Sequence, residues 1–142
     1  MKILVDTNVF LDLLLKREPF YNDGVKFLQY CKVNRNELYI NAMSFRDIEY
    51  ALKKKIKDKQ IIRTMLNSIY CLINKIIPIT PDDAIKAIFE PGVDFEDTLI
   101  MNSAKSAMLD CIVTSNFKDF GKSNIPVFSL QKINEYFEKN KK

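Results

Sequence analysis

Short apolar runs and helix-period patterns alternate along this chain. The first run, Ile3 to Val5, is continuous, which is typical of a parallel strand buried on both faces. Four later runs are also short and apolar, and Pro78 in one of them indicates the edge or the end of a sheet. The expected strands are residues 2–5, 38–40, 76–79, 111–114 and 126–128.

Helical patterns fill the segments between these strands. Apolar residues recur there at intervals of three and four, as they do on the packed face of a helix. The expected helices are residues 9–15, 20–33, one opened by Ser44 and continuing through Ile56, then 58–74, 80–89, 94–108 and one that follows Ser129. Strands that alternate with helices favour an α/β sandwich around a mainly parallel sheet with right-handed crossovers.

Several polar residues mark where these helices begin. Ser44 is a candidate N-cap with Asp47 three residues later, in the capping-box position. Thr80 precedes Pro81, which suits the first position of a helix. We assign Asp82 and Asp83, in the first turn of that helix, to capping alone. Ser129 is the expected cap of the last helix.

The length of the chain indicates one domain. A chain of 142 residues can bury a full core, so we expect a single domain over residues 1–142.

Asp6 interrupts the N-terminus before an apolar signal-peptide region could form, and no apolar run approaches the ~20 residues of a membrane span. We therefore expect a cytoplasmic protein with no membrane partner. The widely spaced Cys31, Cys71 and Cys111 suit buried or partly buried thiols in a reducing compartment.

The composition limits the chemistry that the chain can perform. It has no histidine, which excludes Ser-His-Asp and Cys-His catalysis and leaves carboxylates, lysines, hydroxyls or a hard metal ion. The net charge of +4 is a mild bias toward polyanions. Lysines cluster over residues 53–59 and 139–142; the simplest interpretation is solvated helix faces and a solvated tail, and a phosphate-binding track is the alternative.

Acidic residues and one asparagine fall at the ends of four expected elements. They are Asp6 after the first strand, Asp47 and Glu49 in the helix after the second, Asp94, Glu96 and Asp97 before the fourth, and Asn116 and Asp119 after the fourth. Ligands of open α/β sheets bind outside the carboxyl ends of the strands, so such residues can converge. Singly, Asp47, Asp94 or Asp97 also suits the N-terminal turn of a helix.

Helical spacing selects among these acids. Asp94 and Asp97 lie one turn apart and share a face, and Asp97 also lies on the side of Ile100. Asp47 similarly faces the apolar side, whereas Glu49 is offset toward solvent. Converging carboxylates repel one another and raise their pKa values, and a divalent cation removes that repulsion. Oxygen ligands favour Mg²⁺ or Mn²⁺, and such a site suits phosphoryl-transfer chemistry.

Four segments together resemble the PIN-domain family, which includes VapC-type toxin ribonucleases. Residues 3–8 resemble its opening motif, residues 41–48 and 94–100 the segments of its second and third acids, and residues 112–120 its closing segment. The resemblance covers nearly the whole chain. It implies a three-layer α/β/α sandwich with a central, mainly parallel sheet of about five strands.

The resemblance also implies an activity, a cofactor and partners. The implied activity is Mg²⁺- or Mn²⁺-dependent endoribonuclease cleavage of RNA, a hydrolase reaction. Toxin-like members are held by an antitoxin protein and usually form homodimers. By position, the resemblance assigns catalysis to Asp6, Asp47 and Asp97, metal binding to these three with Asp94 and Asn116, and support through hydrogen bonds to Thr7, Asn8 and Thr114.

Two departures from the family pattern leave alternatives open. The second acid is Asp47 where glutamate is commoner, so Glu49 is the alternative if the helix is rotated. Asn116 stands where many members have a fourth aspartate, which removes one charge. The alternative function is therefore a catalytically weak PIN fold that binds RNA or another protein. A structure-specific nuclease acting on DNA is a third hypothesis.

Overall fold

A computed structural model describes residues 1–91, 94–115 and 123–141 of the chain. In these residues one parallel sheet of five strands has the order β3-β2-β1-β4-β5. The strands are β1 (Lys2–Val5), β2 (Glu37–Asn41), β3 (Lys75–Ile77), β4 (Cys111–Thr114) and β5 (Val127–Ser129). The predicted α/β class and parallel sheet are confirmed, and β3 is an edge strand that ends immediately before Pro78, as that proline indicated.

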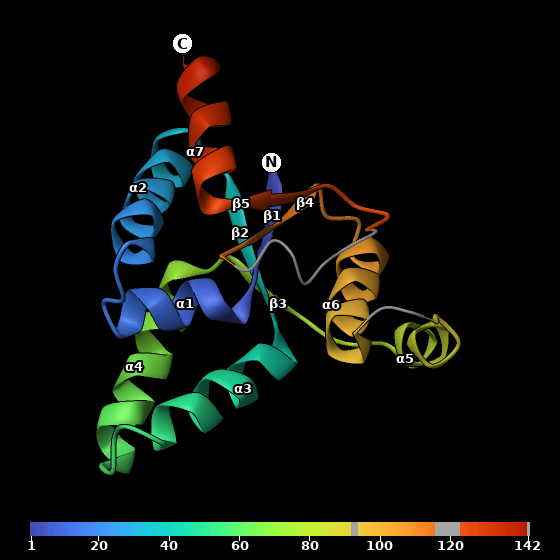
Figure 1. The fold of residues 1–142 in the computed structure, drawn as a ribbon, viewed down its shortest axis with the longest axis horizontal. Coiled ribbons are helices and arrows are strands. Elements are labelled where there is room, and N and C mark those ends of the chain that lie inside the picture. Colours follow the sequence, from blue (N-terminus) through green and yellow to red (C-terminus); the bar gives the residue numbers. More distant parts are fainter. Residues whose placement is uncertain (92–93, 116–122, 142) are drawn as a thin grey trace.

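Helices cover both faces of the sheet (Figure 1). They are α1 (Thr7–Leu14), α2 (Phe20–Val33), α3 (Ala42–Lys53), α4 (Lys59–Leu72), α5 (Pro81–Ile88), α6 (Phe95–Ser106) and α7 (Leu130–Lys139). Successive side chains of a strand point to opposite faces, and β1 shows this directly. Ile3 and Val5 join a core with residues of α1, α2, α3, α4 and α7, whereas Leu4 packs with residues of α6 on the other face. Helix α5 packs against α6.

Helix α3 begins earlier than its sequence signal suggested. Asn41 is the N-cap, and its side chain accepts a hydrogen bond of 2.9 Å from the Met43 amide. Ser44 lies buried inside the helix, so its prediction as N-cap was wrong. Asn41 is also the last residue of β2, so the chain passes from strand to helix without a loop. Asp47 therefore lies in the middle of α3 and not in a capping box.

Other boundaries differ less from the predictions. Helix α1 begins at Thr7, directly after Asp6, two residues earlier than expected. The N-caps Thr80 and Ser129 are confirmed, because the side chains accept hydrogen bonds from the amides of Asp83 and Lys132. The prediction that Cys71 is buried or partly buried was wrong, because Cys71 is exposed. The other two cysteines are buried as expected.

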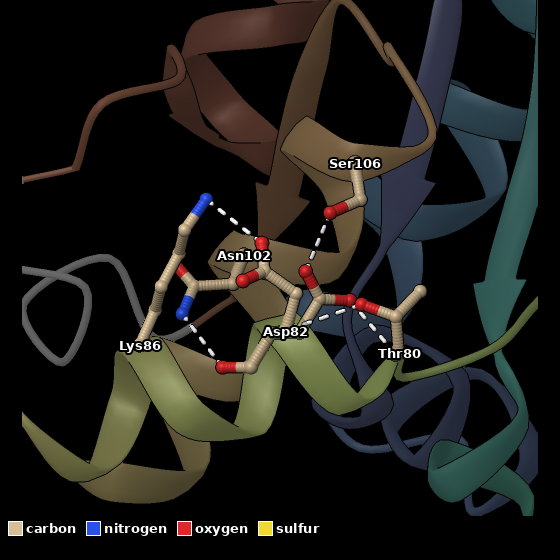
Figure 2. Close-up of polar contacts among 6 residues, drawn as sticks. Thr80, Asp82, Lys86, Asn102 and Ser106 are labelled. Atoms are coloured by element: carbon tan, nitrogen blue, oxygen red, sulfur yellow. Dashed lines mark hydrogen bonds and ion pairs between the residues drawn. The ribbon is translucent and has the colours of Figure 1, made fainter.

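Asp83 does more than cap α5, and Figure 2 labels its partners Thr80, Asn102 and Ser106. Its carboxylate accepts a 2.9 Å hydrogen bond from the Thr80 amide and another from the Ser106 hydroxyl near the end of α6. Asn102 of α6 donates to the Asp83 backbone carbonyl at 3.0 Å. The neighbouring Asp82 forms an exposed ion pair with Lys86. Asp83 thus fixes α5 against α6, the helix whose first turn carries Asp94 and Asp97.

In the described part of the chain, no helix combines the length and the apolar character that crossing a bilayer requires.

The two adjacent acids of α5 should respond differently to truncation. Asp83→Ala removes the capping box and leaves buried partners unpaired, so we expect a loss of about 2–3 kcal/mol in the free energy of unfolding. Asp82→Ala removes an exposed ion pair and should change it by less than about 0.5 kcal/mol. Urea denaturation followed by circular dichroism measures both, and equal losses would contradict this account of Asp83.

Candidate active site

A cavity of about 370 Å³ opens at the carboxyl end of β1. Its walls come from three separate parts of the chain: the turn from β1 into α1, the middle of α3 and the start of α6. The lining residues are Asp6, Thr7, Asn8, Asp47, Asp94, Glu96, Asp97 and Ile100. The structure therefore places four acids and two polar residues of the sequence-based site at one cavity.

Asp6 is held in place by the sheet and by β4. It directly follows β1, and its amide donates a 2.9 Å hydrogen bond to the Val113 carbonyl. The Thr114 hydroxyl, fully buried, donates a 2.8 Å hydrogen bond to Oδ2 of Asp6. Since two contacts fix backbone and carboxylate, the direction of the Asp6 side chain is set before any ligand binds. Thr7 and Asn8 follow it in the first turn of α1 and line the same cavity.

The choice between Asp47 and Glu49 depends on the rotation of α3. Asp47 lines the cavity, and its side chain is 22% exposed. The Arg46 guanidinium lies 3.7 Å from its Oδ1 atom. Glu49 instead pairs with Lys53 at 3.0 Å and lines a different cavity, between α3 and α4. Of the two alternatives that the sequence left open, the structure thus brings Asp47 to the cavity.

The start of α6 contributes Asp94 and Asp97. Asp94 is the N-cap, and its Oδ1 atom accepts a 3.0 Å hydrogen bond from the Asp97 amide. The Thr98 hydroxyl donates to the Asp94 carbonyl at 2.8 Å. Asp94 therefore fills the capping role considered for it and also lines the cavity. Asp97 is half-buried, and Ile100 forms part of the wall one turn later.

Glu96 is a cavity residue that the sequence-based site did not include. Its pKa is raised, first by partial burial, then by a hydrogen bond with Asp47, and further by the charges of Asp47, Asp94 and Asp6. The sequence placed Glu96 at the start of this helix, but its contact with Asp47 depends on how α3 packs beside α6. No periodicity within α6 could have shown that contact.

The described residues contain part of the predicted metal site. Asn116 and Asp119 lie outside them. Within residues 1–91, 94–115 and 123–141, no three or more acid or thiol side chains are arranged so that they could hold a metal ion together. The described residues therefore form an acid-lined cavity and not a preformed metal site.

The sequence of this chain matches a family profile described as the PIN domain over residues 2–118. The chain belongs to the PIN-domain family. Solved structures agree with this assignment at the level of the fold. A search of curated proteins gave no match.

Three solved structures share the fold at low sequence identity. FitAB bound to the IR36 DNA fragment matches with a TM-score of 0.70 and 19% identity, over 90% of this chain and 94% of that one. VapBC2 from Rickettsia felis, bound to a DNA fragment from its promoter, matches with a TM-score of 0.68 and 17% identity, over 91% and 98%. VapC20 from Mycobacterium tuberculosis, a toxin that cleaves the sarcin-ricin loop, matches with a TM-score of 0.61 and 10% identity, over 87% and 98%.

The raised pKa of Glu96 predicts a pH-dependent change in stability. The contribution of Glu96 to stability is fully present when the pH is below the ordinary pKa of 4.5. It is lost as the pH rises through the raised pKa of the folded state. Glu96→Gln should therefore raise the melting temperature at pH 7.5 in EDTA. The gain in the free energy of unfolding should be less than about 1 kcal/mol, because the residue is solvent-exposed. The difference from the unmodified chain should vanish near pH 4.

Glu138→Gln is the matched control, since Glu138 is an exposed glutamate of α7 away from the cavity. Differential scanning calorimetry at both pH values measures the effect. A lower melting temperature for Glu96→Gln at pH 7.5, or an equal gain in the control, would contradict a local destabilisation of the charged Glu96 side chain.

Proposed function

We propose that this chain is an endoribonuclease that hydrolyses phosphodiester bonds of RNA and depends on Mg²⁺ or Mn²⁺. The observation that carries the proposal is the cavity at the end of β1, into which carboxylates of three separate segments converge. Membership in the PIN-domain family supports a nuclease activity. The absence of histidine is no obstacle to this chemistry, because a bound metal ion can lower the pKa of an attacking water.

The donor atoms of the cavity fit a hard divalent ion. All the acidic side chains that line it offer oxygen. Partial burial and a hydrogen bond with Asp47 raise the pKa of Glu96, and the charges of Asp47, Asp94 and Asp6 add to that rise. Mg²⁺ usually retains several waters and binds one or two protein carboxylates directly. A site in which the described residues do not preform a group of three acids is therefore compatible with Mg²⁺.

We propose Asp6, Asp47 and Asp97 as the catalytic acids, with Asp94 as a further metal ligand. Asn116, which lies outside the described residues, remains a proposed ligand from sequence alone. Glu96 joins the proposed set because it lines the cavity and shares a hydrogen bond with Asp47.

The protein's own residues would prepare the site for the reaction. A bound ion supplies positive charge at the scissile phosphate and a water of lowered pKa. The Thr114 hydroxyl holds Oδ2 of Asp6, which fixes the direction of that carboxylate. Asn8 and Thr7 offer neutral hydrogen-bonding groups at the cavity wall, which can orient the sugar-phosphate backbone without adding charge. Such fixed polar groups lower the reorganisation that the reaction requires.

We further propose that the chain is the toxin of a toxin–antitoxin pair and acts in the cytoplasm. FitAB and VapBC2, which share its fold, were solved as assemblies bound to DNA. By analogy, an antitoxin protein is the proposed partner and a homodimer the proposed assembly. The matches to these neighbours cover 90% and 91% of this chain, which supports treating residues 1–142 as a single PIN domain.

Two observations favour a second candidate, a catalytically weak PIN fold that binds RNA. The described residues contain no preformed group of three acids, and Asn116 lacks a charge. Calorimetric titration with Mn²⁺ separates the two candidates: no Mn²⁺ binding with intact RNA binding would favour the binding module. Parallel assays on single-stranded RNA and flapped DNA separate a ribonuclease from the DNA-directed nuclease.

Asp6→Asn tests the proposed nuclease most simply. The amide oxygen can still accept the hydrogen bond of Thr114, so the fold should survive. We expect RNA cleavage in Mn²⁺ to fall at least about 100-fold, because a proposed metal ligand loses its charge. Excess EDTA should abolish cleavage by the unmodified chain.

Asp82→Asn is the control, since Asp82 is an exposed aspartate outside the cavity. It should cleave RNA at the rate of the unmodified chain. Undiminished cleavage by Asp6→Asn, or by the unmodified chain in EDTA, would overturn the proposed function.

A further inference from the structure

A second cavity, of about 410 Å³, lies between α3 and α4. Cationic side chains dominate its wall, and two isoleucines form its apolar part. The lining residues are Glu49, Lys53, Ile56, Lys57, Lys59, Ile62 and Arg63. We call it the basic cavity. Its four cations face a single carboxylate, so the described wall carries a net positive charge.

Most of this positive charge is not neutralised within the protein. Lys53 pairs with Glu49 at 3.0 Å. The ion pairs found in the described part of the chain do not involve Lys57, Lys59 or Arg63. The nearby carboxylate of Asp58 accepts the Gln60 amide at 2.8 Å as the N-cap of α4. The basic cavity therefore offers three exposed cations to an anion from outside.

Helix α3 connects the basic cavity with the acid-lined cavity. Asp47 lines the acid-lined cavity, Tyr50 follows three residues later, and Lys53 lines the basic cavity three residues after that. Residues three apart are neighbours on a helix surface, and each step advances about 4.5 Å along the axis. Tyr50 is 61% exposed, and the Lys54 ammonium lies 4.8 Å from its ring centroid. An exposed aromatic ring among cations thus lies between the two cavities.

We propose that this face of α3 and the basic cavity bind the single-stranded RNA that flanks the scissile bond. Phosphates of the strand occupy the basic cavity, and one base stacks on Tyr50. The assignment rests on the proposed ribonuclease function, since it takes the acid-lined cavity as the place of cleavage. The lysine cluster of residues 53–59 is then a phosphate-binding track, the alternative that the sequence left open.

The exposed ring of Tyr50 favours RNA over an acidic protein segment. Bases stack on exposed aromatic rings with little dependence on sequence, and a carboxylate-rich peptide has no need of Tyr50. Cations beside an aromatic ring are the usual combination for single-stranded nucleic acid.

The test measures RNA binding without cleavage. Fluorescence anisotropy follows a fluorescein-labelled octauridylate binding to the full chain in EDTA. Lys57→Ala/Arg63→Ala should lower the association constant about tenfold at low salt. It should also reduce the slope of log K against log salt by about 1.4, the value for two lost phosphate contacts to a single strand. Tyr50→Ala should lower the association constant about tenfold, and Tyr50→Phe should retain it.

Lys132→Ala/Lys139→Ala is the matched control, because it removes the same charge from exposed positions of α7. It should leave the affinity within twofold of the unmodified chain. An equal loss in this control would show that only net charge matters and would overturn the proposal. Tighter binding of a labelled octaglutamate peptide than of octauridylate, lost in Lys57→Ala/Arg63→Ala, would overturn it in favour of a protein partner.

This outcome is separate from that of the nuclease proposal. The binding assay contains no divalent ion and requires no cleavage. Loss of RNA binding in Lys57→Ala/Arg63→Ala, combined with no cleavage by the unmodified chain, would support the RNA-binding surface and overturn only the nuclease. Full RNA binding by that variant, combined with metal-dependent cleavage lost in Asp6→Asn, would overturn only the surface.

Discussion

Parallel pairing of β1 with both of its neighbours is the constraint on which the candidate site depends. Ile3, Leu4 and Val5 are almost completely buried between β2 and β4, so the strand cannot shift without exposing the core. Asp6 is the next residue, and its amide continues the pairing with Val113. The energy of the sheet therefore holds a carboxylate beside other acids that repel it. A free loop would relieve such repulsion by moving, and this strand end cannot.

Helix α3 contributes a residue to both the acid-lined cavity and the basic cavity. Its middle carries Asp47 to the acid-lined cavity, and its last turn carries Lys53 to the basic cavity. The packing of α4 against α3 completes the basic cavity, since Arg63 belongs to α4. In the proposed function, these two ends serve different purposes on one RNA strand. The acids act at the scissile phosphate, and the cations hold the strand on one side of it.

The sequence predicted the sheet well because buried parallel strands are continuous apolar runs, and the expected strand 111–114 coincides with β4. Ser44 was the wrong cap because Asn41 ends β2 and caps α3 at once, an overlap that a local pattern does not reveal. Helical spacing favoured Asp47 over Glu49, and the structure brings Asp47 to the cavity. Glu96 was not included in the predicted site, because its contact with Asp47 depends on how helices distant in sequence pack together. Local periodicity shows which face of a helix is apolar, but not which acid lies opposite that face.

The central claim is that the acid-lined cavity at the end of β1 is a divalent-metal site. The most direct measurement is anomalous X-ray scattering from crystals of the chain soaked in Mn²⁺. The account predicts a manganese peak within coordination distance of the Asp6 carboxylate, and no such peak in crystals of Asp6→Asn. A cavity that stays free of manganese at saturating Mn²⁺, or a peak that persists unchanged in Asp6→Asn, would contradict it.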